Sequence, residues 1–260
     1  MCVHKRRDKV GRVLLMVTAA AVLAGLMAAS ANAQSFILSQ NGKSVGTASL
    51  AVKQSGGGYA STSGAKIDMP GLKYSFTENA TLDNGYRLTN VQLNGSVNGT
   101  TATVSAAPAG QQFVMKINGK PTTAPLAFHP LTALLPDFDP GGLQSVLNLG
   151  AAHNNRDIWA LIPKQTGSIS ALRIATKADE QGTLDGKPVA VHHFTVASDM
   201  GSSEVYSSPS NQLLQAEWTD EGFALVRQGF KLTPPKRPSA APPAAPKQPA
   251  ATATPTPQQQ

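Results

Sequence analysis

The sequence predicts a mainly β protein: a single antiparallel sheet, strongly curved or forming an incomplete barrel, with a short helical or irregular insertion. Three observations predict it. Apolar and polar residues alternate in many short segments, as around Leu72, Tyr74 and Phe76, and a period of two is typical of strands with one buried face. Asn-Gly and Asp-Gly turn signals separate these segments. Residues 121–155 lack the alternation and are rich in proline.

The N-terminus has the three-part layout of a secretory signal peptide. A basic start over 5–12 precedes an apolar run over 13–26, and Ala31-Asn32-Ala33 is a small-x-small cleavage site. We therefore expect residues 1–33 to be removed and the mature protein to be periplasmic or secreted. A signal that stays uncleaved as a membrane anchor is the alternative. No later apolar run approaches the ~20 residues that span a bilayer, so we expect no transmembrane segment in the mature chain.

The net charge of +7 lies outside the predicted domain. Of the 22 basic and 15 acidic residues, five basic and one acidic lie in 1–33, and three basic residues lie in 234–260. Residues 34–233 therefore hold 14 of each sign. A nucleic-acid-binding domain needs a basic surplus to displace counterions from phosphates, so we expect no nucleic-acid partner.

The only cysteine, Cys2, lies in the predicted signal peptide. The mature domain then has no disulfide and no thiol ligand or nucleophile, and its core alone must hold it together. About 200 residues suffice, since a domain of this size buries roughly 70% of its unfolded surface.

The first part of the domain is interpreted as consecutive hairpins. Asn41-Gly42 connects strands over 35–40 and 44–53, because both residue types tolerate positive φ. The spacing slips between Leu88 and Val91, which predicts a β-bulge. Further Asn-Gly turns are expected at Asn94-Gly95, Asn98-Gly99 and Asn118-Gly119.

Residues 121–155 are interpreted as an insertion that covers an end or mouth of the sheet. Leucine and valine over 143–149 predict a short helix ending at Gly150. Strands are then expected over 157–162, 168–177, 187–197, 203–207, 212–218 and 223–232.

The tail over 234–260 contains no aromatic residue and no Leu, Ile or Val. Such a segment does not offset the entropy of ordering, so a disordered tail is predicted. A spacer or a docking peptide for an envelope component is its functional interpretation. Truncation after Thr233 should shift the melting temperature by less than about 2 °C, measured by thermal melts of both chains; a deletion that unfolds the domain would contradict the assigned boundary.

The common catalytic and cofactor motifs are absent. The chain has no Gly-x-Ser-x-Gly, no His-Glu-x-x-His, no phosphate-binding loop and no dinucleotide fingerprint, and no cofactor is expected. His192 and His193 are the remaining candidates for chemistry. Adjacent residues on a strand face opposite sides, so a metal site would need His129, His153 or carboxylates from elsewhere. The plainer expectation is one packed histidine with a hydrogen-bond partner and one at the surface.

Asp137 and Asp139 are two apart and precede Gly141-Gly142, as acids do in calcium loops. The later acids of such a loop are missing and Pro140 intervenes, so helix-capping acids are the simpler interpretation. Trp159, Trp218 and Phe138 are the candidate ligand-binding residues. We expect both tryptophans to be core or cavity-lining residues.

Two C-terminal stretches carry a family resemblance. Leu184-Asp185-Gly186-Lys187-Pro188-Val189, running into His193-Phe194-Thr195-Val196, resembles a closing hairpin of bacterial exported β-proteins, as does Leu213-Leu214-Gln215-Ala216-Glu217-Trp218 followed by Leu225-Val226-Arg227. Some of those proteins are similar to the outer-membrane lipoprotein carrier, an incomplete barrel that holds acyl chains. The resemblance covers the last third of the chain and implies a curved sheet; it assigns no residue a role.

Three functions remain open. The favoured one is a non-catalytic binding or carrier module of the cell envelope, with an apolar small molecule or lipid as its ligand. The second is a structural or interaction protein tethered by its tail. The third is a hydrolase or metal-dependent enzyme that uses His192 or His193 with Asp137, Asp139 or Asp157.

Overall fold

The structure is a computed structural model that describes residues 33–154, 156–164, 167–199 and 201–234. Residues 1–32 of the predicted signal peptide and most of the predicted tail therefore lie outside the described residues. The first strand begins at Gln34, the residue expected to start the mature chain.

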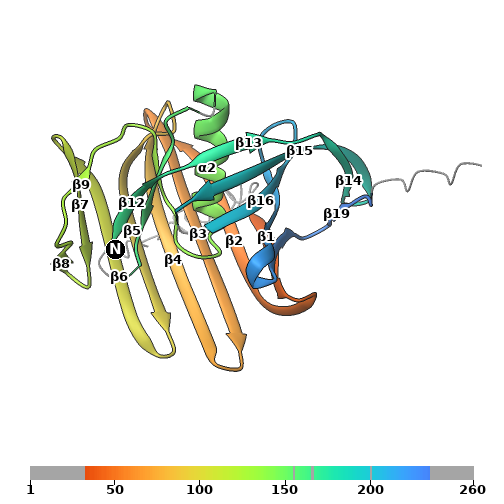
Figure 1. The fold of residues 1–260 in the computed structure, drawn as a ribbon, viewed down its shortest axis with the longest axis horizontal. Helices are drawn as coiled ribbons and strands as arrows, with labels where there is room; N and C mark the ends of the chain where they lie inside the picture. The colour runs from red at the N-terminus through yellow and green to blue at the C-terminus, as the bar shows by residue number, and fades with distance from the viewer. Residues whose placement is uncertain (1–32, 155, 165–166, 200, 235–260) are drawn as a thin grey trace, which may run out of the picture.

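The first half of the fold is a meander of long strands, in which each strand pairs antiparallel with the next (Figure 1). These strands are β1 (Gln34–Gln40), β2 (Lys43–Ser55), β3 (Gly58–Met69), β4 (Leu72–Asp83), β5 (Leu88–Val97), β6 (Thr100–Ala109) and β7 (Gln112–Ile117), and the two-residue strands β8 (Lys120–Pro121) and β9 (Leu126–Ala127) pair with β7. Burial alternates along them, with Ala65 and Ile67 inside and Lys66 exposed on β3. The predicted period of two is confirmed.

The expected Asn-Gly turns are confirmed at Asn41, Asn98 and Asn118, each of which has a φ near +50°. The expected turn at Asn94-Gly95 is wrong, because both residues lie within β5. A Cβ on Gly95 would stand 2.6 Å from the Ser75 carbonyl oxygen. Glycine is required there because the neighbouring strand approaches closely. The dipeptide Asn-Gly looks the same in the sequence whether its glycine serves a turn or such a close approach.

The predicted bulge is also confirmed. Thr81 pairs with Asn90 and Leu82 pairs with Leu88, which leaves Thr89 as the extra residue. The bulge is where the spacing of apolar residues slips in the sequence.

The insertion contains one helix, α2 (Pro140–His153), and more strand than expected. Asp139 caps the helix, and Asn154 ends it in the left-handed conformation, so the helix runs past the predicted end at Gly150. The strands β10 (Thr132–Leu134), β11 (Trp159–Ile162) and β12 (Ser168–Ala171) form a separate sheet in which β10 and β11 are parallel. Every residue of β10 is buried. A strand buried on both faces shows no alternation, which is why the sequence did not reveal it.

Each of two segments that were expected to be single strands forms two strands, and the two strands pair with different partners. Residues 168–177 form β12 and β13 (Arg173–Thr176), and residues 223–232 form β18 (Phe223–Arg227) and β19 (Phe230–Leu232), with Gly229 between them at φ +80°. The remaining elements are β14 (Glu180–Leu184), β15 (Lys187–Ser198), β16 (Gly201–Ser207), β17 (Leu213–Trp218) and the short 3-10 helix η1 (Thr219–Glu221). η1 lies outside 121–155, where all helical structure was expected.

The larger sheet has 16 strands in the order β19-β14-β15-β16-β17-β18-β1-β2-β3-β4-β5-β6-β7-β8, with β13 and β9 off this path. Within the described residues its ends, β19 and β8, do not pair, so the sheet is open, and Figure 1 shows that it curves. Strands β13 and β15 lie across from β2 and β3, and α2 packs between these layers (Figure 1). A second small core lies beside the paired strands β14 and β19. It is made of Val191, Tyr206, Leu214 and Phe230.

No helix among the described residues is long and apolar enough to cross a membrane.

Candidate functional site

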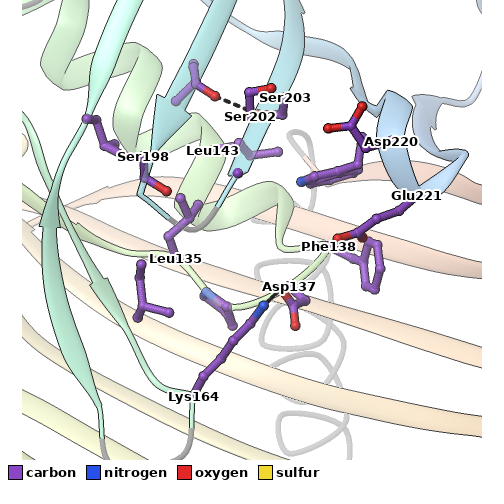
Figure 2. Close-up of a pocket in the computed structure, with 16 residues that line it drawn as sticks. Leu135, Asp137, Phe138, Leu143, Lys164, Ser198, Ser202, Ser203, Asp220 and Glu221 are labelled. Atoms are coloured by element: carbon purple, nitrogen blue, oxygen red, sulfur yellow. Dashed lines mark hydrogen bonds and ion pairs between the residues drawn. The ribbon is translucent and has the colours of Figure 1, made fainter.

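A cavity of about 210 Å³ opens at the N-terminal end of α2. Its walls come from five places in the chain: residues 135–138 with the first turn of α2, the end of β11, Leu172 between β12 and β13, the β15–β16 hairpin, and the β17–η1 corner (Figure 2). The apolar lining consists of Leu135, Pro136, Phe138, Leu143, Ile162, Leu172, Val196 and Trp218. The polar lining is Asp137, Lys164, Ser198, Ser202, Ser203, Asp220 and Glu221.

Phe138 lines the cavity and also belongs to the larger of the two hydrophobic cores. Its φ of +60° turns the backbone just before the helix, and its side chain is 8% exposed. The ring packs at 5.3 Å from the Trp218 ring and at 4.6 Å from the Phe223 ring. This candidate residue is therefore both a cavity wall and a core contact.

Trp218 is the second aromatic wall, as the sequence predicted. It ends β17 opposite Phe223 and immediately precedes η1. The side chain is half-buried and contacts the core rather than lying within it. Trp159, by contrast, stacks on His129 at 3.6 Å and does not line this cavity.

We expect Trp218→Ala to lower the free energy of unfolding by about 2 kcal/mol, less than the 3–5 kcal/mol typical of a fully buried tryptophan, because part of its ring already faces the cavity. Urea unfolding of both chains measures this. Trp218→Phe, which keeps an aromatic wall, is the control and should lose less. A loss as large as for a fully buried ring would show that Trp218 belongs to the core.

A second cavity of about 220 Å³ lies farther along α2. Val146, Leu147 and Gly150 of the helix face Ile174 and Phe194 across it. Val196 lines both cavities, so a single side chain lies at the border between them.

The loop that carries Phe138 is held by a buried pair of acids. Asp139 is fully buried and accepts hydrogen bonds from the amides of Gly141 (3.0 Å) and Gly142 (2.6 Å). Glu78, on β4, is 3% exposed, and its Oε2 has no hydrogen-bond donor among the described residues. Burial, and then the charge of Asp139, raise the pKa of Glu78 well above its usual range. Burial also raises the pKa of Asp139, although the helix amides oppose that rise.

This pair answers the question that the sequence left about Asp137 and Asp139. A proton on Glu78 allows it to donate to the Asp139 carboxylate, which leaves Asp139 free to cap the helix. Asp137 instead points to the surface and pairs with Lys164 at 2.8 Å. The two acids thus have different roles: Asp137 forms a surface ion pair, and helix capping is confirmed for Asp139.

The two adjacent histidines lie away from this cavity and on opposite faces of β15, as expected. His192 pairs with Asp179 at 2.9 Å, and its side chain is 36% exposed. His193 is 12% exposed and lies between two carboxylates, with Nδ1 2.8 Å from Glu180 and Nε2 2.8 Å from Glu204. The His193 ring therefore bridges Glu180 on β14 and Glu204 on β16.

The proposed partners of these histidines are not the ones observed. Their carboxylate neighbours are Asp179, Glu180 and Glu204 rather than Asp137, Asp139 or Asp157. His153 approaches the Gly85 carbonyl at 3.4 Å. Among the described residues, no group of three or more His, Asp or Glu side chains could hold a metal ion.

Sequence reasoning missed most of the cavity. Nothing in the sequence indicated that Lys164, Leu143 and Val196 would line a cavity, and Asp220-Glu221 was interpreted only as part of a turn. Their segments are separated by up to about 80 residues in the chain, and only the folding of the sheet brings them together.

These features define an open, strongly curved antiparallel β protein with one described helix against its inner face and a small cavity at the helix N-terminus. The chain belongs to the DUF6134 family, a domain of unknown function whose model matches residues 36–228.

Two solved structures are similar to the chain. The β-barrel-like protein of the DUF1849 domain of unknown function from Brucella abortus is 9% identical, with a TM-score of 0.49, over 77% of this chain and 96% of that chain. A DUF1089 family protein from Pseudomonas aeruginosa is 10% identical, with a TM-score of 0.40, over 64% of this chain and 87% of that chain. No curated protein matches the chain.

Proposed function

We propose that this protein is a non-catalytic binding module that holds an apolar small molecule, or the apolar part of a lipid, in the cavity between Phe138 and Trp218. The observation that carries the proposal is the lining: eight apolar side chains converge from five segments, with a few polar groups at the edge. Ligand sites are typically concave and apolar, with a small number of polar groups that orient the ligand.

The size of the cavity limits the ligand. A volume of about 210 Å³ is below the 300–1,000 Å³ typical of sites for drug-sized ligands. The second cavity begins on the other side of Val196. In the carrier version of the proposal, an elongated ligand such as an acyl chain displaces the Val196 side chain and occupies both cavities.

The proposal includes export. The predicted signal peptide over 1–33 supports action in the periplasm or outside the cell. N-terminal sequencing of the protein from the envelope fraction tests this, with Gln34 expected as the first residue. An intact Met1 on cytosolic protein would contradict it.

Native mass spectrometry of protein purified from the organism that makes it tests the binding function. A bound lipid or other apolar molecule is expected. A protein that is always empty would favour the structural alternative, and a stoichiometric metal would favour the enzyme.

A cavity-filling variant locates the ligand. Leu135→Trp should abolish binding of the neutral dye N-phenyl-1-naphthylamine, measured by dye fluorescence, because Leu135 lines the cavity and is half-buried. Leu131→Trp is the matched control, since Leu131 is also half-buried but does not line the cavity. Equal dye binding by both variants would place the ligand elsewhere.

A further inference from the structure

We propose that the ligand of this cavity is a cationic amphiphile, such as an alkyl amine or an alkylated quaternary ammonium compound, whose positive head group lies at the Trp218–η1 corner. This inference rests on the proposed function and specifies the ligand class of the same site.

The charges at the cavity edge favour a cation. Three carboxylates line it, Asp137, Asp220 and Glu221, against one ammonium group, that of Lys164. Lys164 is already paired with Asp137 at 2.8 Å, so the positive charge at the edge is compensated. The remaining charge comes from Asp220 and Glu221 and is negative.

The two η1 carboxylates lack partners. Both side chains are exposed, and neither makes an ion pair or side-chain hydrogen bond with any other described residue. Figure 2 shows them on one side of the cavity, across from the Lys164–Asp137 pair. An incoming head group therefore meets uncompensated negative charge on the η1 side.

The aromatic walls add a second, independent preference. Trp218 precedes the first of the two acids by two residues, with Thr219 between them, and the rings of Trp218 and Phe138 pack edge to face with centroids 5.3 Å apart. The face of an aromatic ring attracts an ammonium group, and tryptophan does so most strongly. Aromatic side chains beside unpaired carboxylates are suited to an alkylated ammonium group, whose methyl groups can contact the apolar lining.

The apolar depth accepts the rest of the ligand. Leu135 and Leu143 line the cavity to the left of Asp220 and Glu221 in Figure 2, and Leu143 is 2% exposed. A fatty acid would place its carboxylate beside Asp220 and Glu221, where like charges repel, and would have to break the Lys164–Asp137 pair to gain a counter-ion. The structure therefore favours an alkyl cation over a fatty-acid anion.

The test compares three probes with the same octyl chain: octyltrimethylammonium, octanoate and 1-octanol. The full mature chain carries Trp159→Phe, so that the fluorescence of Trp218 alone reports binding. We expect octyltrimethylammonium to bind at least about tenfold more tightly than octanoate, with 1-octanol in between, and the preference to weaken as sodium chloride screens the exposed carboxylates.

The double variant Asp220→Asn, Glu221→Gln should remove the preference for the cation, so that octyltrimethylammonium binds no more tightly than 1-octanol. The matched control is Asp68→Asn, Asp179→Asn, which changes the net charge equally at exposed positions outside the cavity and should keep the preference. If the control lost it too, net charge rather than this site would be responsible, and the inference would be overturned.

The outcomes separate the two proposals. Equal binding of all three probes, or tighter binding of octanoate, would overturn the cationic ligand and leave the apolar site standing. Failure of every probe to bind would overturn the proposed function itself.

Discussion

Asp139→Ala is expected to lower the free energy of unfolding by about 3 kcal/mol or more. The substitution removes two charge-assisted hydrogen bonds, to the amides of Gly141 and Gly142, from a fully buried helix cap. Loss of such a cap costs about 0.5–2 kcal/mol in exposed helices, and hydrogen bonds to charged groups add about 1.5–3 kcal/mol when their partners stay buried. Glu78 also loses the acceptor for its proton.

Urea unfolding at neutral pH measures this loss, and Asp137→Ala is the matched control. Asp137 lies two residues away but is half-exposed and pairs with Lys164 at the surface. Such pairs contribute about 0–1 kcal/mol, so the control should remain close to the parent. Equal losses in the two variants would mean that the cap does not hold α2 in place.

Glu78→Gln is expected to stabilise the protein at pH 8 and to flatten its stability against pH. Because burial raises the pKa of Glu78 far above the unfolded value of 4.5, the folded state keeps a proton that the unfolded state releases. The free energy of unfolding therefore falls as the pH rises above about 4.5, up to the folded pKa. Glutamine stays neutral and can still donate to Asp139, so the variant avoids this loss.

We expect a gain of about 1 kcal/mol or more at pH 8, since each unit of pKa difference corresponds to about 1.4 kcal/mol. At pH 4, where both states of the parent are largely protonated at Glu78, the gain should disappear. Urea unfolding across this pH range is the measurement. Glu221→Gln, the same substitution at an exposed site, should keep the parent's pH dependence. If the free energy of unfolding of Glu78→Gln changed with pH in parallel with that of the parent, Glu78 would not be the titrating group. Burial also raises the pKa of Asp139, so the free energy of unfolding of Glu78→Gln should still fall with pH, with a smaller slope than in the parent.

The local features of the fold could be predicted wherever one face of a strand is buried. The alternation along β3 and β4, the turns at Asn41 and Asn98 and the bulge opposite Thr81 are all confirmed. Each depends on residues within about ten positions of one another. The capping role of Asp139 was likewise predictable, because an acid before Pro-Gly-Gly is a local helix-start signal.

Prediction failed where a distant segment decides the outcome. β10 is buried on both faces and pairs in parallel with β11, so its residues Thr132–Leu134 show no alternation. Gly95 is not a turn residue because the backbone of β4 passes close to it. After the break at Gly229, β19 pairs with β14 instead of continuing β18, and Phe230 of β19 packs into the second core.

The candidate site divides in the same way. Phe138 and Trp218 were predictable as large apolar side chains in strand or loop contexts, but their contact at 5.3 Å was not. Whether Asp220 and Glu221 are paired depends on which Lys or Arg side chains the fold brings near them, and the sequence does not show this. The compensation of Lys164 depends on the loop that ends at Asp139.

By itself, the sequence determined the β class, the turns, the helix cap and the balanced charge of the domain, because each follows from backbone preference or composition. The tertiary structure alone decided how the sheet curves over α2, which strands pair outside the meander, and where the cavity lies. Those features depend on contacts between residues far apart in the chain, whose free energies appear only when the whole core closes. The acid pair illustrates both: Asp139 was identifiable as a cap, but its partner Glu78, 61 positions earlier, is an ordinary strand residue until β4 folds against the helix.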